Sequence, residues 1–163
     1  MDPADHLRRP WRVHALAAAD GASLHDVWQI DAALSPRATL DRWIEAFREE
    51  RQGHASRGLF AIRRLLGRVL RLDRANSRFE PVYREPEEQL LRIDNRTVTA
   101  YLHLSLADRH PRLAVYVRTK GRVGAAYMRL IDPFRRHVVY PGLVAAGRRA
   151  VRRVNAAYDG GAG

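Results

Sequence analysis

The chain has 163 residues, with 29 basic against 18 acidic side chains and a formal net charge of +11. It contains no cysteine, which excludes disulfides, thiolate nucleophiles and cysteine-ligated metal centres. The length suits one domain, and no apolar stretch approaches the roughly 20 residues of a spanning helix. The acidic start lacks the apolar core of a signal peptide, so we expect a soluble cytoplasmic protein.

The positive charge gathers in two segments that the sequence predicts to be helical, residues 36–78 and 109–153. In the second of these Asp132 is the sole acid. An anionic partner such as nucleic acid or lipid headgroups would explain this bias. We favour solvated helix exteriors whose arginine stems cover apolar surface, so nucleic acid is not the expected partner. The candidates for anion binding are Arg148, Arg149, Arg152 and Arg153.

The N-terminal half is predicted to hold one strand and then helices. Hydrophobicity alternates over residues 11–16, which predicts a strand, and Ser23 can cap a short helix over 23–28. Ser35 and Pro36 open a second helix to about residue 50, and a third is expected over about 56–72. We expect a flexible N-terminus over 1–10, one domain over 11–158 and a flexible tail over 159–163.

An antiparallel sheet is predicted in the middle of the chain. Short strands over about 79–83 and 91–93 precede a turn at 94–97, after which residues 97–106 alternate strictly. If residues 107–112 form the loop before a strand over 113–118, Leu106 faces Leu113. This register places every aliphatic residue on one face. It also sets His103 opposite Tyr116, and Tyr101 opposite Arg118, on the other face.

A long amphipathic helix follows Gly121. Its apolar stripe runs through Val123, Tyr127, Leu130, Ile131, Phe134 and Val138. Pro133 and Pro141 should kink or restart it, because each removes an amide donor. An apolar sheet face followed by such a helix predicts an α+β fold of two layers, with the antiparallel sheet gripping the C-terminal helix.

Several local strings resemble a known family. They are Asp94-Asn95-Arg96-Thr97, Arg118-Thr119, Gly124-Ala125-Ala126-Tyr127-Met128, Ile131-Asp132-Pro133-Phe134-Arg135-Arg136 and Val138-Val139-Tyr140. These residue strings and the order of the predicted elements resemble a bacterial domain-of-unknown-function family of the START-like (helix-grip, SRPBCC, polyketide cyclase-like) superfamily. The resemblance implies a curved sheet around the C-terminal helix, with a cavity between them.

The resemblance also implies a range of functions. Members of the superfamily bind lipids, sterols, polyketides or plant hormones, and some are polyketide cyclases. Related domains occur fused behind nucleotide-binding reductase-like domains, so the resemblance implies association with a reductase-like partner. This chain has no glycine-rich dinucleotide fingerprint, and we expect no cofactor.

His103, Tyr101 and Tyr116 form the best polar cluster for catalysis. A histidine–tyrosine pair can transfer protons, as an aldol-type cyclisation requires. We favour the alternative of a cross-strand group on the solvated face, since the aliphatic face must meet the helix. The seven histidines show no i, i+4 pair or other ligand spacing, so no metal site is expected.

Our leading hypothesis is a protein that binds a small apolar molecule between sheet and helix. The candidate ligand-binding residues are Trp28, Trp43, Leu102, Leu104, Val115, Tyr127, Ile131 and Phe134. Plain core packing is the simpler explanation of the same residues. A cyclase or dehydratase on this fold is the second hypothesis, and a basic module for anionic surfaces is the third.

Overall fold

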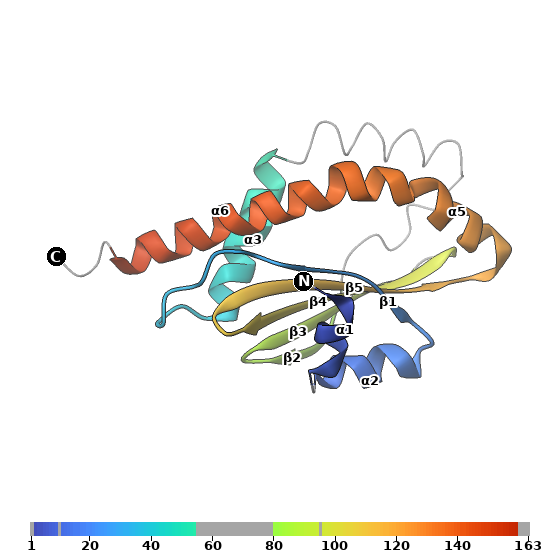
Figure 1. The fold of residues 1–163 in the computed structure, drawn as a ribbon, viewed down its shortest axis with the longest axis horizontal. Coiled ribbons are helices and arrows are strands. Elements are labelled where there is room, and N and C mark those ends of the chain that lie inside the picture. The colour runs from blue at the N-terminus through green and yellow to red at the C-terminus, as the bar shows by residue number, and fades with distance from the viewer. Residues whose placement is uncertain (1, 10, 55–79, 95, 160–163) are drawn as a thin grey trace.

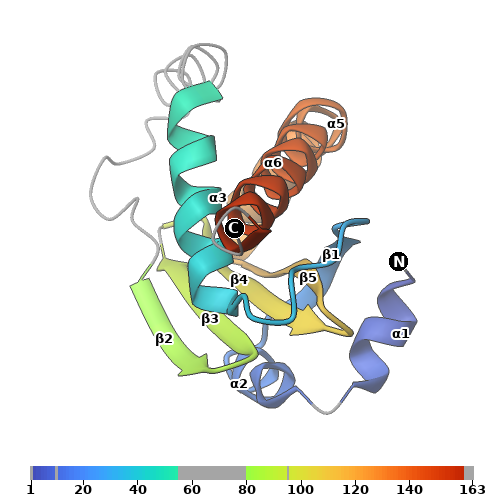
Figure 2. The same ribbon diagram turned by 90° about the vertical axis from the view of Figure 1, so that its left-hand side faces the viewer.

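A computed structural model describes residues 2–9, 11–54, 80–94 and 96–159. In this part of the chain, five strands form one antiparallel sheet in the order β1-β5-β4-β3-β2. The strands are β1 (Ser23–Gln29), β2 (Glu80–Glu85), β3 (Glu88–Asp94), β4 (Val98–Ala107) and β5 (His110–Thr119). Figures 1 and 2 show helices on both faces of the sheet. The predicted α+β class with a long C-terminal helix is confirmed.

One face, here called the helix-grip face, carries α3 (Leu40–His54) and α6 (Tyr140–Asp159). The opposite face, here called the N-terminal face, is covered by α1 (Pro3–Arg8) and α2 (Arg12–Ala19). The predicted helix over about 56–72 lies outside the described residues. None of the described helices is long and apolar enough to cross a membrane.

Three N-terminal predictions are wrong. The helix predicted to open at Ser35 and Pro36 begins instead at Leu40 as α3, after a turn at residues 36–37. The other two concern short segments. Residues 11–16 belong to the start of α2, where Val13 and Ala17 are fully buried one helical turn apart. Residues 23–28 form β1 rather than a helix, because they pair along β5 in the sheet. Six residues are too few to distinguish the 3.6-residue period of a helix from the two-residue period of a strand, so tertiary contacts decide which structure forms.

The predicted hairpin between β4 and β5 has the right faces but the wrong partners. The turn is only Asp108 and Arg109, whose φ angles of 53° and 65° are left-handed at both positions, as a two-residue hairpin of type I′ requires. Leu104 therefore pairs with Leu113, and Tyr101 pairs with Tyr116. The shift of two residues from the predicted register leaves each side chain on its predicted face.

The main core lies between the helix-grip face, α3 and α6. Trp43 is fully buried, stacks on Phe47 with ring centroids 5.2 Å apart, and donates from Nε1 to the Gly147 carbonyl at 3.3 Å. Leu104 and Leu113 contribute the sheet side of this core and are at most 1% exposed. The part of the helix-grip face that lies beneath α3 and α6 is therefore closely packed.

The long C-terminal helix is interrupted near the prolines, as predicted. It begins as α5 (Gly121–Phe134), which contains Pro133, passes through the π-helical segment η1 (Arg135–Val139) and continues as α6. Pro141 lies in the first turn of α6, where a missing amide is tolerated. π-Helical turns are rare and are found often at functional sites.

Candidate functional site

The helix-grip face is less buried beneath α5 than beneath α6. Leu113, Leu104 and Leu102 are buried, and so is Val98 at the far end of β4. Between them, Ile93, Ala100, Val115 and Val117 are half-buried. Trp28 of β1 is also half-buried, and it lies opposite Leu113 in the register. The sheet therefore offers an apolar floor whose covering becomes incomplete toward α5.

A polar triad lies beside this floor and consists of Asp26, Arg135 and Tyr140. Tyr140 donates from its hydroxyl to Asp26 Oδ2 at 2.6 Å, and Arg135 Nη2 donates to the same oxygen at 2.9 Å. Arg135 also donates from Nε to the Tyr140 oxygen at 2.6 Å and lies over the Tyr140 ring. The Trp28 ring packs against the Tyr140 ring, and the two ring centroids are 4.0 Å apart.

Two backbone irregularities bring the triad together. β1 has a bulge between Leu24 and Asp26, which puts the Asp26 carboxylate on the helix-grip face opposite Val115. η1 begins at Arg135, so the guanidinium and the Tyr140 hydroxyl meet this carboxylate from the helix. Burial is the main cause that raises the pKa of Tyr140, the hydrogen bond to Asp26 adds to it, and Arg135 opposes it.

The N-terminal face holds a second polar group, here called the histidine cluster: His6, His14, His103, Tyr116 and Glu88. Tyr116 Oη lies 2.7 Å from His14 Nδ1 and 3.3 Å from His6 Nε2. The His6 ring centroid is 5.3 Å from that of His14 and 5.4 Å from that of His103. His103 Nε2 lies 3.2 Å from Glu88 Oε2, an ion-pair distance without hydrogen-bond geometry.

Burial controls the protonation of this cluster. It is the largest cause that lowers the pKa of His6 to about 3, and the positive charges that His103 and His14 can carry lower it further. Burial also lowers the pKa of His103, although Glu88 opposes the shift. His6 and His103 are therefore neutral imidazoles at neutral pH.

The predicted catalytic candidates are all buried, which corrects the expected solvated face. His103 is 0% exposed, Tyr116 is 2% exposed and Tyr101 is 6% exposed, because α1 and α2 cover this face. Tyr116 joins the histidine cluster. Tyr101 instead donates to Asp20 Oδ2 at 2.6 Å, and it is Arg92, not Arg118, that lies over its ring.

The predicted ligand-binding residues fall into three groups. Trp43, Leu102 and Leu104 belong to the packed core. Trp28 and Val115 are partly buried against it, close to the triad. The third group lies on α5, and its side chains are outside the described part of the structure: Tyr127, Ile131 and Phe134.

Three of the four arginines predicted to bind anions are paired with acids. Arg148 Nη2 donates to Asp31 Oδ2 at 2.8 Å, Arg149 bonds Glu50 at 2.8 Å, and Arg153 lies 2.7 Å from Glu49. Arg152 is exposed. Internal carboxylates thus offset much of the positive charge on this side of α6.

Sequence reasoning missed His6, His14 and Glu88 because it placed the first two outside any helix and began the β3 strand too late. It also missed Asp26, Arg135 and Tyr140 as a group. The available signal was that Arg135 and Tyr140 both occur in the strings that carry the family resemblance.

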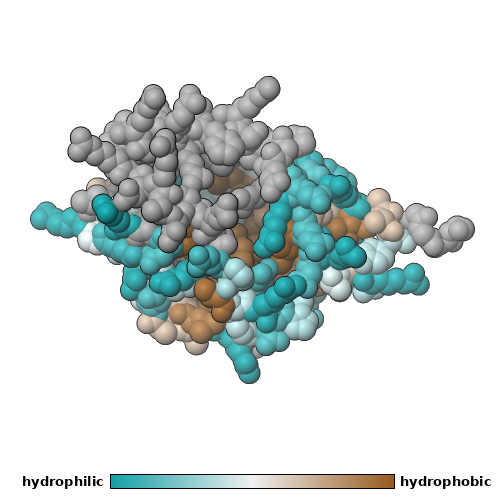
Figure 3. All heavy atoms as spheres, turned by 180° about the vertical axis from the view of Figure 1, so that it is seen from behind, coloured by the Kyte–Doolittle hydropathy of each residue, from teal (hydrophilic) through white to brown (hydrophobic). Residues whose placement is uncertain are grey.

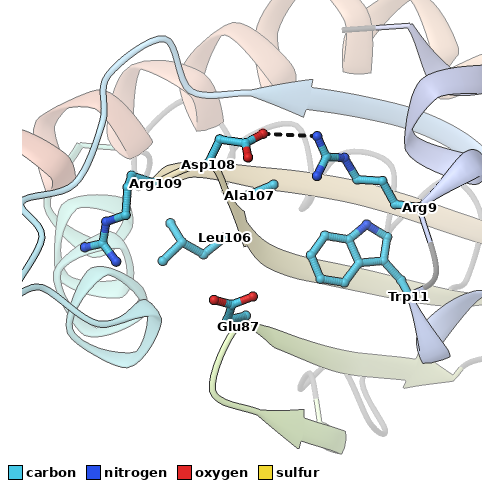
Figure 4. Close-up of a pocket in the computed structure, with 7 residues that line it drawn as sticks. All are labelled: Arg9, Trp11, Glu87, Leu106, Ala107, Asp108 and Arg109. Carbon is cyan, nitrogen blue, oxygen red and sulfur yellow. Dashed lines mark hydrogen bonds and ion pairs between the residues drawn. The ribbon is translucent and has the colours of Figure 1, made fainter.

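A cavity of about 300 Å³ opens at the edge of the N-terminal face (Figure 4). The residues that line it are Arg9, Trp11, Glu87, Leu106, Ala107, Asp108 and Arg109. A wider groove of about 680 Å³ continues from Arg9 and Trp11 along the β2–β3 hairpin to Tyr83 and Glu88. Within the described ranges, no three histidine or acidic side chains are placed to hold a metal ion.

The fold and these sites define an α+β protein with a sheet and a long C-terminal helix, as in the helix-grip arrangement. The chain belongs to the family described as "Protein of unknown function (DUF2867)", whose model matches residues 18–142. That range begins at the end of α2 and ends in the first turn of α6, so it includes the triad but not α1. Comparisons with curated proteins and with solved structures find no match.

Proposed function

We propose that this protein binds a small, mainly apolar molecule with one polar group, between the sheet and the α5–η1 part of the C-terminal helix. The observation that carries this proposal is the decline in burial along the apolar floor, from Leu113 at 0% exposed to the half-buried Val115 and Val117. These half-buried aliphatic side chains leave apolar surface on the sheet that a small molecule can cover. The resemblance to the START-like superfamily supports the same location.

The triad supplies the polar end of the proposed site. The Arg135 side chain is 11% exposed and that of Asp26 is 25% exposed, so the ion pair is largely shielded from water. A ligand hydroxyl or carbonyl that accepts from Arg135 or donates to Asp26 would be oriented there, while Trp28 provides a flat apolar wall. Few polar groups on an apolar surface is the usual composition of such pockets.

A cyclase or dehydratase at the same place is the second candidate. The Tyr140 hydroxyl and the Asp26 carboxylate are 2.6 Å apart, and such a pair can relay a proton to a bound carbonyl compound. Binding comes first in either case, so one experiment tests the common step.

The test is native mass spectrometry of the purified chain, with solvent extraction of whatever copurifies, compared between the wild type and A100L. Ala100 lies on the half-buried floor, so a leucine there fills ligand space without adding a polar group. The matched control is A157L, the same change at an exposed position of α6. We expect an apolar adduct in the wild type and A157L that is lost in A100L. An adduct-free wild type that also shows no thermal shift with fatty acids, sterols or aromatic polyketides would refute the proposal.

A further inference from the structure

We propose a second ligand site on the N-terminal face, for a short aliphatic carboxylate held between α1, the start of α2 and the ends of β3, β4 and β5. It is independent of the site proposed above, because the sheet separates the two. The argument rests on buried hydrogen-bond donors, on the cavity beside them and on the charges around that cavity.

Five buried atoms that can only donate make no hydrogen bond within the described protein. Two of them, Arg92 Nε and Arg118 Nε, belong to arginines that pair with Asp20 through other nitrogens. The other three are Arg9 Nε, Trp11 Nε1 and Arg112 Nη1. They cannot satisfy one another, because none of them accepts. A buried donor without a partner costs about 1–3 kcal/mol, so three together need a specific explanation. A ligand rich in acceptor oxygens is the direct chemical complement.

The sheet positions these donors rigidly. Arg112 is 4% exposed, and its Nε donates to Gln29 Oε1 at 2.9 Å, which fixes the guanidinium. Ser105 lies opposite Arg112 in the register, is fully buried, and its Oγ likewise makes no bond in the described structure. The His103 ring lies 5.5 Å from that of Trp11, which orients the indole toward the same end of β4.

Two of the three donor residues, Trp11 and Arg9, line the cavity of about 300 Å³, whereas Arg112 lies outside its lining. Figure 4 shows the Trp11 indole and the Arg9 guanidinium on one side, with Leu106 and Ala107 along the strand. Arg9 Nη2 donates to Asp108 Oδ2 at 3.1 Å, which leaves the buried Nε donor for a ligand. The apolar Leu106, Ala107 and indole surfaces suit a short aliphatic chain.

The surrounding acids select the charge of the ligand. Glu87 and Asp108 line the cavity and Glu88 lies deeper against His103, while Arg109 is engaged with the Leu34 and Ala38 carbonyls. These carboxylates would repel a dianion such as phosphate strongly, whereas the donors of Arg9, Arg112 and Trp11 match the two oxygens of one monoanion. A short carboxylate therefore fits better than phosphate.

The test is a titration of the full chain with sodium butyrate, followed by amide and indole NMR shifts. Sodium phosphate and sodium chloride at equal ionic strength are the comparison anions. We expect saturable butyrate shifts at the Trp11 indole and the Arg112 amide, and no comparable saturation with the other two salts. A concentration of about ten times the Kd should also raise the melting temperature by roughly 3–5 °C.

Two variants distinguish the site from general attraction to a basic protein. W11F keeps the aromatic ring against His103 but removes one donor, and should weaken butyrate binding by about tenfold. R112Q should weaken it at least as much, and W11F remains informative if R112Q does not fold. R152Q, at an exposed arginine of α6, is the control and should leave affinity unchanged. Absent saturation, equal responses to all three salts, or equal losses in W11F and R152Q would overturn the proposal.

Discussion

Acidification should destabilise the protein through His6. The imidazole of the unfolded chain has a pKa of 6.5, whereas the buried ring in the folded protein has a pKa of about 3. Between these values the unfolded state binds more protons, so the free energy of unfolding falls as the pH falls. At pH 4.5 the difference amounts to about 2.7 kcal/mol, and at pH 7.5 it is close to zero. Positive charge on any of the groups that face His6, namely His103, His14, Arg112 and Arg9, opposes its protonation.

The assay is urea unfolding at pH 7.5 and at pH 4.5 for the wild type and H6F. Phenylalanine fills a similar volume but does not titrate, so the pH dependence of its unfolding free energy should be smaller by about 2–3 kcal/mol. Its loss of the 3.3 Å contact with Tyr116 is the same at both pH values and cancels. H137F, at an exposed histidine, is the control and should keep the wild-type dependence. Equal pH dependence in the wild type and H6F would refute the reasoning.

Two further substitution experiments test the C-terminal helix. G124A should destabilise by about 1–3 kcal/mol, because a Cβ there would overlap the Thr97 carbonyl oxygen, whereas G142A has open space and should stabilise by up to about 1 kcal/mol. Thermal unfolding of both variants checks the contrast, and destabilisation by G142A would contradict it. Y140F and D26N, measured singly and together by urea unfolding, should show a coupling of about 1.5–3 kcal/mol, since a hydroxyl bonds a partly shielded carboxylate. Additive effects of Y140F and D26N would show that the hydrogen bond between Tyr140 and Asp26 contributes no coupling energy to stability.

The sequence predicts best those elements whose hydrophobic pattern is long. Ten residues of strict alternation identify β4, and the stripe across residues 123–138 identifies the C-terminal helix with its interruption near Pro133. The segments at 11–16 and 23–28 are too short for periodicity to separate helix from strand. Their structures depend on partners distant in the chain, since β1 is a strand by virtue of its pairing with β5.

The hairpin register shows a different limit. The aliphatic pattern of β4 and β5 is unchanged by a shift of two residues, so only the turn decides between the alternatives. Asp108 and Arg109 both take left-handed conformations, which an aspartate tolerates and an arginine rarely adopts. Arg109 is retained there by its hydrogen bonds to the Leu34 and Ala38 carbonyls, a long-range contact that no local pattern encodes.

The polar face of the sheet shows why the site itself was harder to predict than the fold. Alternation correctly separated His103 and Tyr116 from the aliphatic residues, but the step from a polar face to a solvated face assumed that nothing covers it. α2 covers it by presenting small residues such as Ala17, which is fully buried and lets the helix approach the sheet closely. A polar face that is buried must pair its hydrogen-bond donors and keep its titratable groups uncharged. On the N-terminal face the buried histidines are neutral, so the charges are suppressed. The donors Arg112 Nη1 and Trp11 Nε1, however, have no hydrogen-bond partner in the described protein. That imbalance, rather than the net charge of +11, is the electrostatic feature that points to a ligand.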